Sequence, residues 1–173
     1  LKTKKNLRLI DGTNYTSKEI LKFVSFNQDI MVQSEDLNLF SNKNFKIVSK
    51  RKPSLKQLKD LIFAFNVCRY VKSNAIVLAS NETTVGIGSG QPSRLDSCQI
   101  AIDKMKKFNL ETDNLVASSD AFFPFIDGIE KLVQSGVRAV VQPSGSVRDK
   151  EIINFANETD TVLLFSKTRH FRH

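Results

Sequence analysis

The sequence predicts an α/β fold, a three-layer α/β/α sandwich built around a mixed sheet. After Pro53, stretches with apolar residues at helical spacing alternate with short runs rich in Val, Ile and Leu. Strands separated by helices pair in one sheet that helices cover on both faces. The composition agrees, since 40% of the 173 residues are apolar and 25% are charged, as in a typical globular domain.

Residues 1–52 are interpreted as a basic, irregular N-terminal segment of a larger domain. Residues 1–60 hold most of the formal net charge of +8. Short strands are expected at 7–10 and 29–33, with Asn-rich and Ser-rich loops between them. Such a cationic arm could bind nucleic acid, face a polyanionic small ligand, or be an ordinary solvated segment.

Residues 53–173 are predicted to form the α/β subdomain. Ser54 and Gln57 have the spacing of a capping box, and the apolar residues that follow recur at helical spacing over a wide face. Two β-rich runs at 75–79 and 84–88, separated by a polar turn, predict a hairpin.

Helices and strands then alternate to the end of the chain. The order from the capping box onward is α-β-β-α-β-α-β-α-β, and the leading hairpin makes the sheet mixed. The expected elements after the hairpin are a helix from about residue 93, a strand at 115–117, a helix at 127–134, a strand at 139–141, a helix at 148–157 and a strand at 161–165.

Several classes of protein are excluded by composition. Cys68 and Cys98 are too few for a disulfide framework or a Cys-rich zinc site and are expected to be buried thiols. The histidines are His170 and His173, so a Ser-His-Asp triad would need one of them. No apolar run approaches the ~18 residues of a membrane span, and no signal peptide is recognised. Because the first residue is Leu1, we expect a fragment of a longer chain.

The loop of residues 86–94 is rich in glycine and leads from a strand into a helix. It is neither a P-loop nor a convincing dinucleotide-binding fingerprint, so it could contact a ligand or simply be a tight turn. Arg94 at the helix start opposes the helix dipole and is expected to have an anionic or carbonyl partner. If Arg94 serves only a substrate, Arg94→Ala should leave thermal stability unchanged or slightly raised.

Two later loops also follow strand ends, where ligands bind in open α/β sheets. Residues 118–127 contain three phenylalanines, which suit a flat heterocycle or plug the core, and Asp127 is explained by the helix dipole alone. In residues 142–149, Ser146 and Asp149 have the spacing of a helix cap, although the N–H groups of this loop could hold an anion.

The tail of residues 168–173 follows the last predicted strand. A solvated end is the ordinary expectation for such a tail. Phe171, placed between two Arg-His steps, is nevertheless the kind of side chain that docks.

Taken in order, five segments resemble one family: VKSNAIVLA, GIGSGQPSR, SDAFFPF, QPSGSVRDKEII and the terminal RHFRH. They are similar to the AICAR formyltransferase domain that bifunctional purine biosynthesis proteins carry beside an IMP cyclohydrolase. The similarity runs from about Asp29 to His173 and corresponds to the C-terminal portion of the formyltransferase region. It implies a cytidine-deaminase-like fold without the zinc site, a cytoplasmic homodimer, and no metal, nucleic-acid or membrane partner.

The resemblance also implies a reaction, transfer of the formyl group of 10-formyltetrahydrofolate to the 5-amino group of AICAR during de novo IMP synthesis. That amine is a poor nucleophile, so catalysis needs orientation of the carboxamide, proton removal and stabilisation of an oxyanion. Asn74 and Arg94 would be catalytic, and Arg169 would bind the nucleotide phosphate. The implied substrate-binding residues are Asn74, Arg94, Phe122, Arg169 and Phe171, and the implied folate-binding residues are Pro124, Phe125, Asp127, Ser144 and Gly145.

The sequence also departs from the family. The family's catalytic Lys-His pair has no counterpart, because no Lys-His dipeptide occurs in this sequence. Ile126 stands where many relatives carry Arg, and residues 91–93 are Gln-Pro-Ser in place of the more usual Gln-Met-Ser. We therefore expect the chain to be inactive alone and to need the upstream half of the enzyme. The alternative is a non-catalytic nucleotide- or folate-binding module.

Overall fold

A computed structural model describes residues 11–13, 21–108 and 114–172 of the chain. The chain divides into two compact units, Leu1–Leu37 and Asn38–His173. The strand expected at 7–10 lies outside the described residues.

The first unit contains an antiparallel hairpin of β1 (Leu21–Phe26) and β2 (Asp29–Ser34), joined by a turn in which Asn27 has a φ of 55°. The strand expected at 29–33 is confirmed as β2. Strand β1 was not predicted. Its apolar residues are exposed in the described structure, as are those of β2, so this hairpin has no core of its own to specify it.

The second unit is built on a six-stranded sheet with the order β3-β8-β7-β6-β4-β5. Strands β6, β7 and β8 are parallel, whereas β3 is antiparallel to β8 and β4 is antiparallel to both β5 and β6. The mixed sheet and the hairpin at its start are therefore confirmed. The strands are β3 (Phe45–Ile47), β4 (Ile76–Ser80), β5 (Thr83–Gly88), β6 (Val116–Ser119), β7 (Ala139–Pro143) and β8 (Val162–Ser166).

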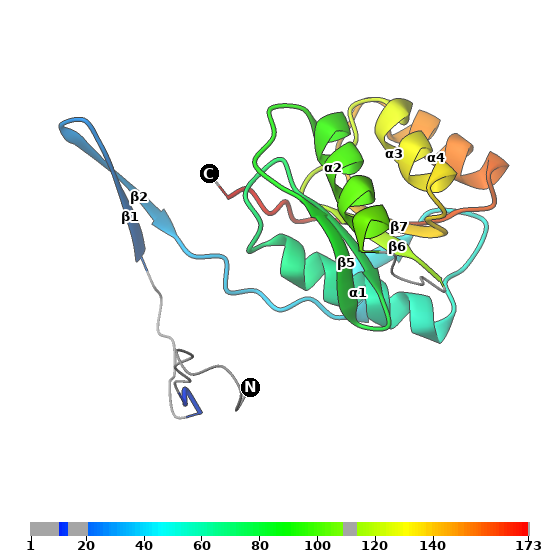
Figure 1. The fold of residues 1–173 in the computed structure, drawn as a ribbon, viewed down its shortest axis with the longest axis horizontal. Helices are drawn as coiled ribbons and strands as arrows, with labels where there is room; N and C mark the ends of the chain where they lie inside the picture. Colours follow the sequence, from blue (N-terminus) through cyan, green and yellow to red (C-terminus); the bar gives the residue numbers. More distant parts are fainter. Residues whose placement is uncertain (1–10, 14–20, 109–113, 173) are drawn as a thin grey trace. The chain divides into compact units, whose positions relative to one another are not determined.

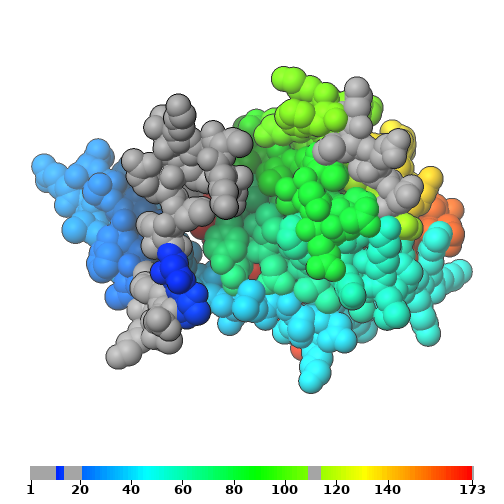
Figure 2. Space-filling view, turned by 60° about the horizontal axis from the view of Figure 1, so that its bottom comes forward, coloured from blue at the N-terminus to red at the C-terminus, as the bar shows by residue number. Residues whose placement is uncertain are grey.

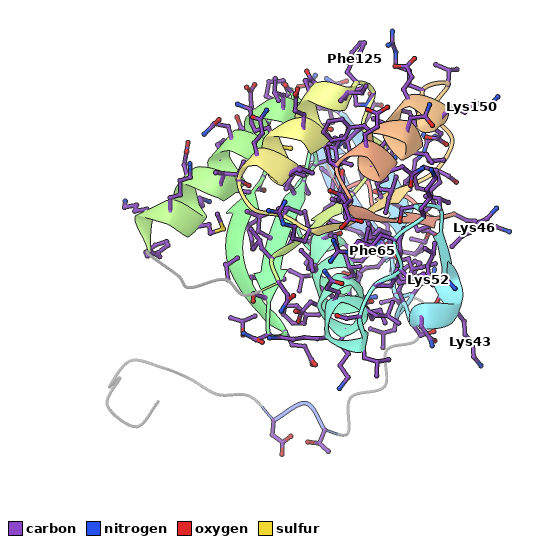
Figure 3. All side chains as sticks on the ribbon, turned by 90° about the vertical axis from the view of Figure 1, so that its right-hand side faces the viewer. Lys43, Lys46, Lys52, Phe65, Phe125 and Lys150 are labelled. Carbon is purple, nitrogen blue, oxygen red and sulfur yellow. The ribbon has the colours of Figure 1, made fainter. Side chains whose placement is uncertain are left out.

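Helices cover both faces of this sheet, which makes three layers (Figure 1). Helix α1 packs on one face, and α2, α3 and α4 lie together on the other. Each face has its own apolar cluster, and Figure 3 shows Phe65 of α1 inside the molecule. The helices are α1 (Leu55–Cys68), α2 (Arg94–Lys107), α3 (Ile126–Gln134) and α4 (Asp149–Glu158), with a short 3-10 helix, η1 (Asn42–Asn44), before β3.

Helix α1 begins where the sequence predicts. The Ser54 hydroxyl accepts the Gln57 N–H at 3.1 Å, and the Gln57 side chain accepts the Ser54 N–H at 3.0 Å. This reciprocal capping box satisfies two of the N–H groups that a helix start leaves without partners.

Figure 2 views the side of the molecule on which α1, in teal, lies beside the β4–β5 hairpin, in green. Asp60 of α1 is buried, and its carboxylate accepts the backbone N–H groups of Asn81 and Glu82 at 3.1 and 2.6 Å. Both turn residues have positive φ, 53° and 51°. A buried carboxylate therefore stabilises this turn against the helix.

The glycines that end β5 allow α2 to approach the sheet closely. A Cβ atom on Gly86 would lie 2.1 Å from the Ala101 carbonyl oxygen, and one on Gly88 would lie 1.9 Å from the Ser97 carbonyl oxygen. These contacts involve backbone atoms, so no side chain can move aside. Of the two interpretations of this loop, tight strand–helix packing therefore accounts for Gly86 and Gly88.

The compact unit begins at Asn38, whereas the sequence pattern predicts that the subdomain starts at residue 53. Strand β3 joins the sheet edge beside β8, and the Lys50 N–H donates to the Asn157 side chain at 2.7 Å. Arg51 forms an ion pair with Asp160. A three-residue strand has too short a pattern to be recognised, which explains the difference. The Lys43, Lys46 and Lys150 side chains labelled in Figure 3 point outward from the molecule.

Candidate active site

Five chain segments meet at one end of the sheet, where the parallel strands have their carboxyl ends. Strand β4 runs antiparallel to β5 and β6, so its start, at Ile76, lies opposite Gly88 and Ser119, near the ends of β5 and β6. Strands β6, β7 and β8 are parallel, so their carboxyl ends lie at this same end of the sheet. The segment before β4, the loops after β5, β6 and β7, and the tail after β8 are thereby brought together.

A cavity of about 440 Å³ opens at this end of the sheet. Its lining includes five of the residues singled out in the sequence: Asn74, Arg94, Pro124, Phe125 and Asp127. The ring of Phe125 is 53% exposed, and Figure 3 shows it pointing outward at the surface. The structure therefore places the two residues implied to be catalytic, Asn74 and Arg94, and three residues implied to bind folate around one cavity.

Asn74 presents an acceptor to this cavity. Its side-chain NH₂ group donates to the carbonyl oxygens of Gln91 and Pro92 at 2.9 and 3.0 Å. An amide NH₂ has two donors, so both are used within the chain. The Asn74 carbonyl oxygen accepts the Ser97 hydroxyl at 2.8 Å, which fixes the backbone here. The side-chain oxygen Oδ1 is thus the group that Asn74 can offer to a ligand.

Arg94 is held in place by three partners. Its Nε donates to the Ser119 hydroxyl at 3.0 Å, one terminal nitrogen donates to the Phe122 carbonyl at 3.3 Å, and the other pairs with Asp120 at 2.7 Å. The side chains of Arg94 and Asp120 are 10% and 0% exposed. The expected anionic and carbonyl partners therefore exist within the chain. This buried pair contradicts the expectation that Arg94→Ala leaves stability unchanged.

Asp120 was not singled out by the sequence analysis. It directly follows β6 and is completely buried, and its second carboxylate oxygen has no hydrogen-bond partner among the described residues. Its backbone N–H donates to Ala75, and its carbonyl accepts the His170 N–H at 2.9 Å. The signal that could have revealed Asp120 was an acidic residue directly after a predicted strand, at the end of the sheet where the loops converge.

The tail is docked rather than solvated. The His170 ring is buried against Phe40 and Phe65, with ring centroids 5.0 and 4.4 Å apart. Phe171 is 46% exposed and borders a second cavity of about 370 Å³ that shares Asn74 with the first. Docking of the tail is confirmed, but the ring that is fully buried is His170 and not Phe171.

Arg169 lies beside two other implied site residues. Its guanidinium carbon is 4.7 Å from the centroid of the Phe122 ring, a cation–π distance. A terminal nitrogen lies 3.4 Å from the position that a Cβ on Gly145 would take. This cluster does not border the 440 Å³ cavity, but Phe122 connects the two because its carbonyl accepts from Arg94.

The N–H groups of the loop after β7 are already used within the chain. Those of Gly145 and Ser146 donate to the Asp149 carboxylate at 2.8 and 3.2 Å, and that of Ser144 donates to the Ser166 carbonyl at 2.9 Å. The suggestion that they hold an anion is therefore not supported by this geometry. The guanidinium of Arg148 lies 4.8 Å from the Phe125 ring and brings the loop next to the cavity.

The two cysteines are buried thiols, as expected. Burial raises the pKa of Cys98 to about 12, and burial together with the nearby Asp120 carboxylate raises the pKa of Cys68 further. Among the described residues, no His, Cys, Asp and Glu side chains cluster in a way that could hold a metal ion. Within the same residues, no helix is long and apolar enough to cross a membrane.

Fold and site together define an α/β/α domain with a polar and aromatic cavity at the carboxyl ends of its parallel strands. Comparison with known proteins gives the family. Residues 1–104 match the model of the AICARFT/IMPCHase bienzyme. The chain belongs to this family.

Curated relatives agree. The chain is 43% identical over 171 residues to the bifunctional purine biosynthesis protein PurH of Persephonella marina, which covers 98% of this chain and 33% of the relative. It is 43% identical over 173 residues to PurH of Chlorobium phaeobacteroides and 45% identical over 175 residues to PurH of Buchnera aphidicola, each covering 100% of this chain and 33% of the relative. The chain thus spans about a third of the length of these relatives.

Proposed function

We propose that this chain supplies part of the AICAR formyltransferase site of a bifunctional purine biosynthesis enzyme, as the C-terminal portion of its formyltransferase region. The observation that carries the proposal is the meeting of Asn74 and Arg94 in one cavity. A primary carboxamide has a carbonyl that accepts hydrogen bonds and an NH₂ group that donates them. Asn74 offers an acceptor oxygen and Arg94 offers unused donors, so the two side chains complement the carboxamide of AICAR.

The rest of the nucleotide extends toward the tail in this proposal. Arg169 binds the phosphate because a guanidinium can donate two parallel hydrogen bonds to phosphate oxygens. Phe122 and Phe171 border the path between phosphate and carboxamide, the first beneath Arg169 and the second beside Asn74.

The folate co-substrate lies on the opposite side of the cavity. The exposed Phe125 ring and Pro124 offer apolar surface to a flat pterin, and the Asp127 carboxylate can accept from pterin N–H groups. Arg148 lies 4.8 Å from the Phe125 ring, so the loop that carries Ser144 and Gly145 would border the folate site on the side nearest Arg169.

In the reaction, residues of this chain orient the carboxamide of AICAR and polarise its carbonyl group. Arg94 donates to the carboxamide oxygen and Asn74 accepts from its NH₂ group, which fixes the ring on which the reacting amine sits. When that amine attacks the formyl carbon, it must lose a proton, and the bond between the formyl carbon and the folate nitrogen must break so that tetrahydrofolate leaves with a proton on that nitrogen. No Lys-His dipeptide occurs in this sequence, so we propose that the general base comes from elsewhere in the full-length protein. The full-length protein is proposed to be a homodimer in the cytoplasm.

Formyl-transfer kinetics test this proposal. The full-length polypeptide should be active, the 173-residue chain alone should not, and Asn74→Ala in the full-length protein should lower turnover by about tenfold or more. Asn154→Ala, at an exposed position of α4, is the matched control. A full-length protein that binds AICAR or folate without formyl transfer would favour the non-catalytic binding module instead.

A further inference from the structure

Asp120 is not among the residues that line the cavity, but it pairs with Arg94, which does line it. Asp120 is completely buried and pairs with one terminal nitrogen of Arg94 at 2.7 Å. The carboxylate of Asp120 therefore compensates the positive charge of Arg94 even when no ligand is bound. An exposed pair of this kind would be weakened by solvent, but here the side chains are 10% and 0% exposed.

The hydrogen-bond count shows what remains for a ligand. A guanidinium has five N–H donors, and Arg94 uses one each on Nε and on its two terminal nitrogens. One hydrogen remains on each terminal nitrogen. With its charge compensated, Arg94 offers these two N–H groups as polar donors rather than as a bare cation.

Asn74 adds an element that works against anions. Because its NH₂ group is occupied by Gln91 and Pro92, it faces the cavity with an oxygen. That oxygen accepts from an amide NH₂ but repels a carboxylate oxygen placed in the same position. The carboxylate of Asp127, which lines the cavity, adds negative charge. Both features favour a neutral amide over an anion of the same shape.

We infer that Asp120 is a specificity-determining residue, which makes the Asn74–Arg94 pair select a neutral primary carboxamide over a carboxylate. This inference rests on the proposed function, because it concerns the same nucleotide in the same cavity. Asp120 acts through Arg94 and does not touch the ligand. Discrimination of this kind arises from a polar group left with the wrong partner, and not from a difference in size.

The test compares two ligands that differ only at this group: AICAR and its analogue in which the carboxamide is a carboxylate. Dissociation constants for both are measured by titration calorimetry on the full-length wild-type protein and on Asp120→Asn, which keeps the shape and removes the charge. Wild type should bind the carboxamide more tightly. Asp120→Asn should shift the ratio of the two constants at least about tenfold toward the carboxylate, or ~1.4 kcal/mol.

Asp60→Asn is the matched control, since Asp60 is also a buried carboxylate but holds the β4–β5 turn. It should lower stability without changing the ratio. An unchanged ratio in Asp120→Asn overturns the inference. If Asp120→Asn does not fold, wild type decides, because a wild type that binds the carboxylate as tightly as the carboxamide also overturns it. If wild type binds neither ligand, the proposed function fails, and the inference fails with it.

Discussion

Removing Arg94 should destabilise this domain strongly, because it leaves Asp120 as a buried charge without its counter-ion. Arg94→Ala deletes an ion pair of 2.7 Å in which the partner is 0% exposed, and hydrogen bonds to Ser119 and Phe122. Breaking a buried pair by removing one partner costs about 3–5 kcal/mol. That is a large share of the roughly 5–15 kcal/mol that holds a domain folded, and it corresponds to a fall in Tm on the order of 10 °C.

Urea unfolding of the 173-residue chain measures this cost, and a double-mutant cycle assigns it. Arg94→Ala, Asp120→Ala and the double variant should show a coupling free energy of about 2 kcal/mol or more, because neighbours in one network are not additive. Arg51→Ala is the control: it breaks an exposed ion pair with Asp160, worth at most ~1 kcal/mol. Wild-type stability in Arg94→Ala, or a coupling near zero, would refute the reasoning.

Three further predictions concern the scaffold of the site. Gly88→Ala should destabilise the chain by about 1–3 kcal/mol or more in urea unfolding, because its Cβ would lie 1.9 Å from the Ser97 carbonyl oxygen. Gly12→Ala should have no effect, because among the described residues nothing lies within 4 Å of the added Cβ. Equal effects of the two substitutions would contradict the close packing of Gly88 against α2. Ser54→Ala should cost about 1 kcal/mol by loss of the α1 cap, and an unchanged urea midpoint would mean that the capping box adds nothing. The pKa of Cys98 rises from 9.0 to about 12 on folding, so above pH 9.0 the unfolded thiol loses its proton first and the free energy of unfolding falls with pH, by up to about 1.4 kcal/mol per pH unit. Cys98→Ala should therefore show a shallower fall of this free energy between pH 9.0 and about 12. An identical slope in wild type and Cys98→Ala would contradict the burial of this thiol.

Most helices and strands of the fold could be predicted from local sequence patterns. The capping box of Ser54 and Gln57 and the apolar periodicity after it were enough to place α1, since these signals are local. Strands β7 and β8 were recognisable because they are buried on both faces and contain the apolar runs AVV and VLLF, whereas β6 has only Val116 and Ala117 before two buried serines. Strands β1 and β3 were missed, because one is an exposed hairpin arm and the other is a three-residue edge strand.

The site was harder to predict than the fold. The resemblance pointed to Asn74 and Arg94, and the cavity that they share agrees with it. Asp120 was missed because its importance depends on a contact between residues 26 positions apart, on two different elements. The same limit applies to His170, whose burial depends on Phe40 and Phe65 from distant parts of the chain. Sequence spacing cannot show such pairs.

The central claim is that this chain binds the AICAR nucleotide, with Arg169 on the phosphate, and steady-state kinetics of the full-length protein test it most directly. Arg169→Ala should raise the KM for AICAR by roughly tenfold or more, since a lost charge-assisted hydrogen bond costs about 1.5–3 kcal/mol, with a smaller effect on the KM for 10-formyltetrahydrofolate. Arg169→Lys should lie between wild type and Arg169→Ala, because lysine keeps the charge but not the planar pair of donors. Arg172→Ala, in the same tail, should leave both constants near wild type. An unchanged KM for AICAR in Arg169→Ala would contradict the account.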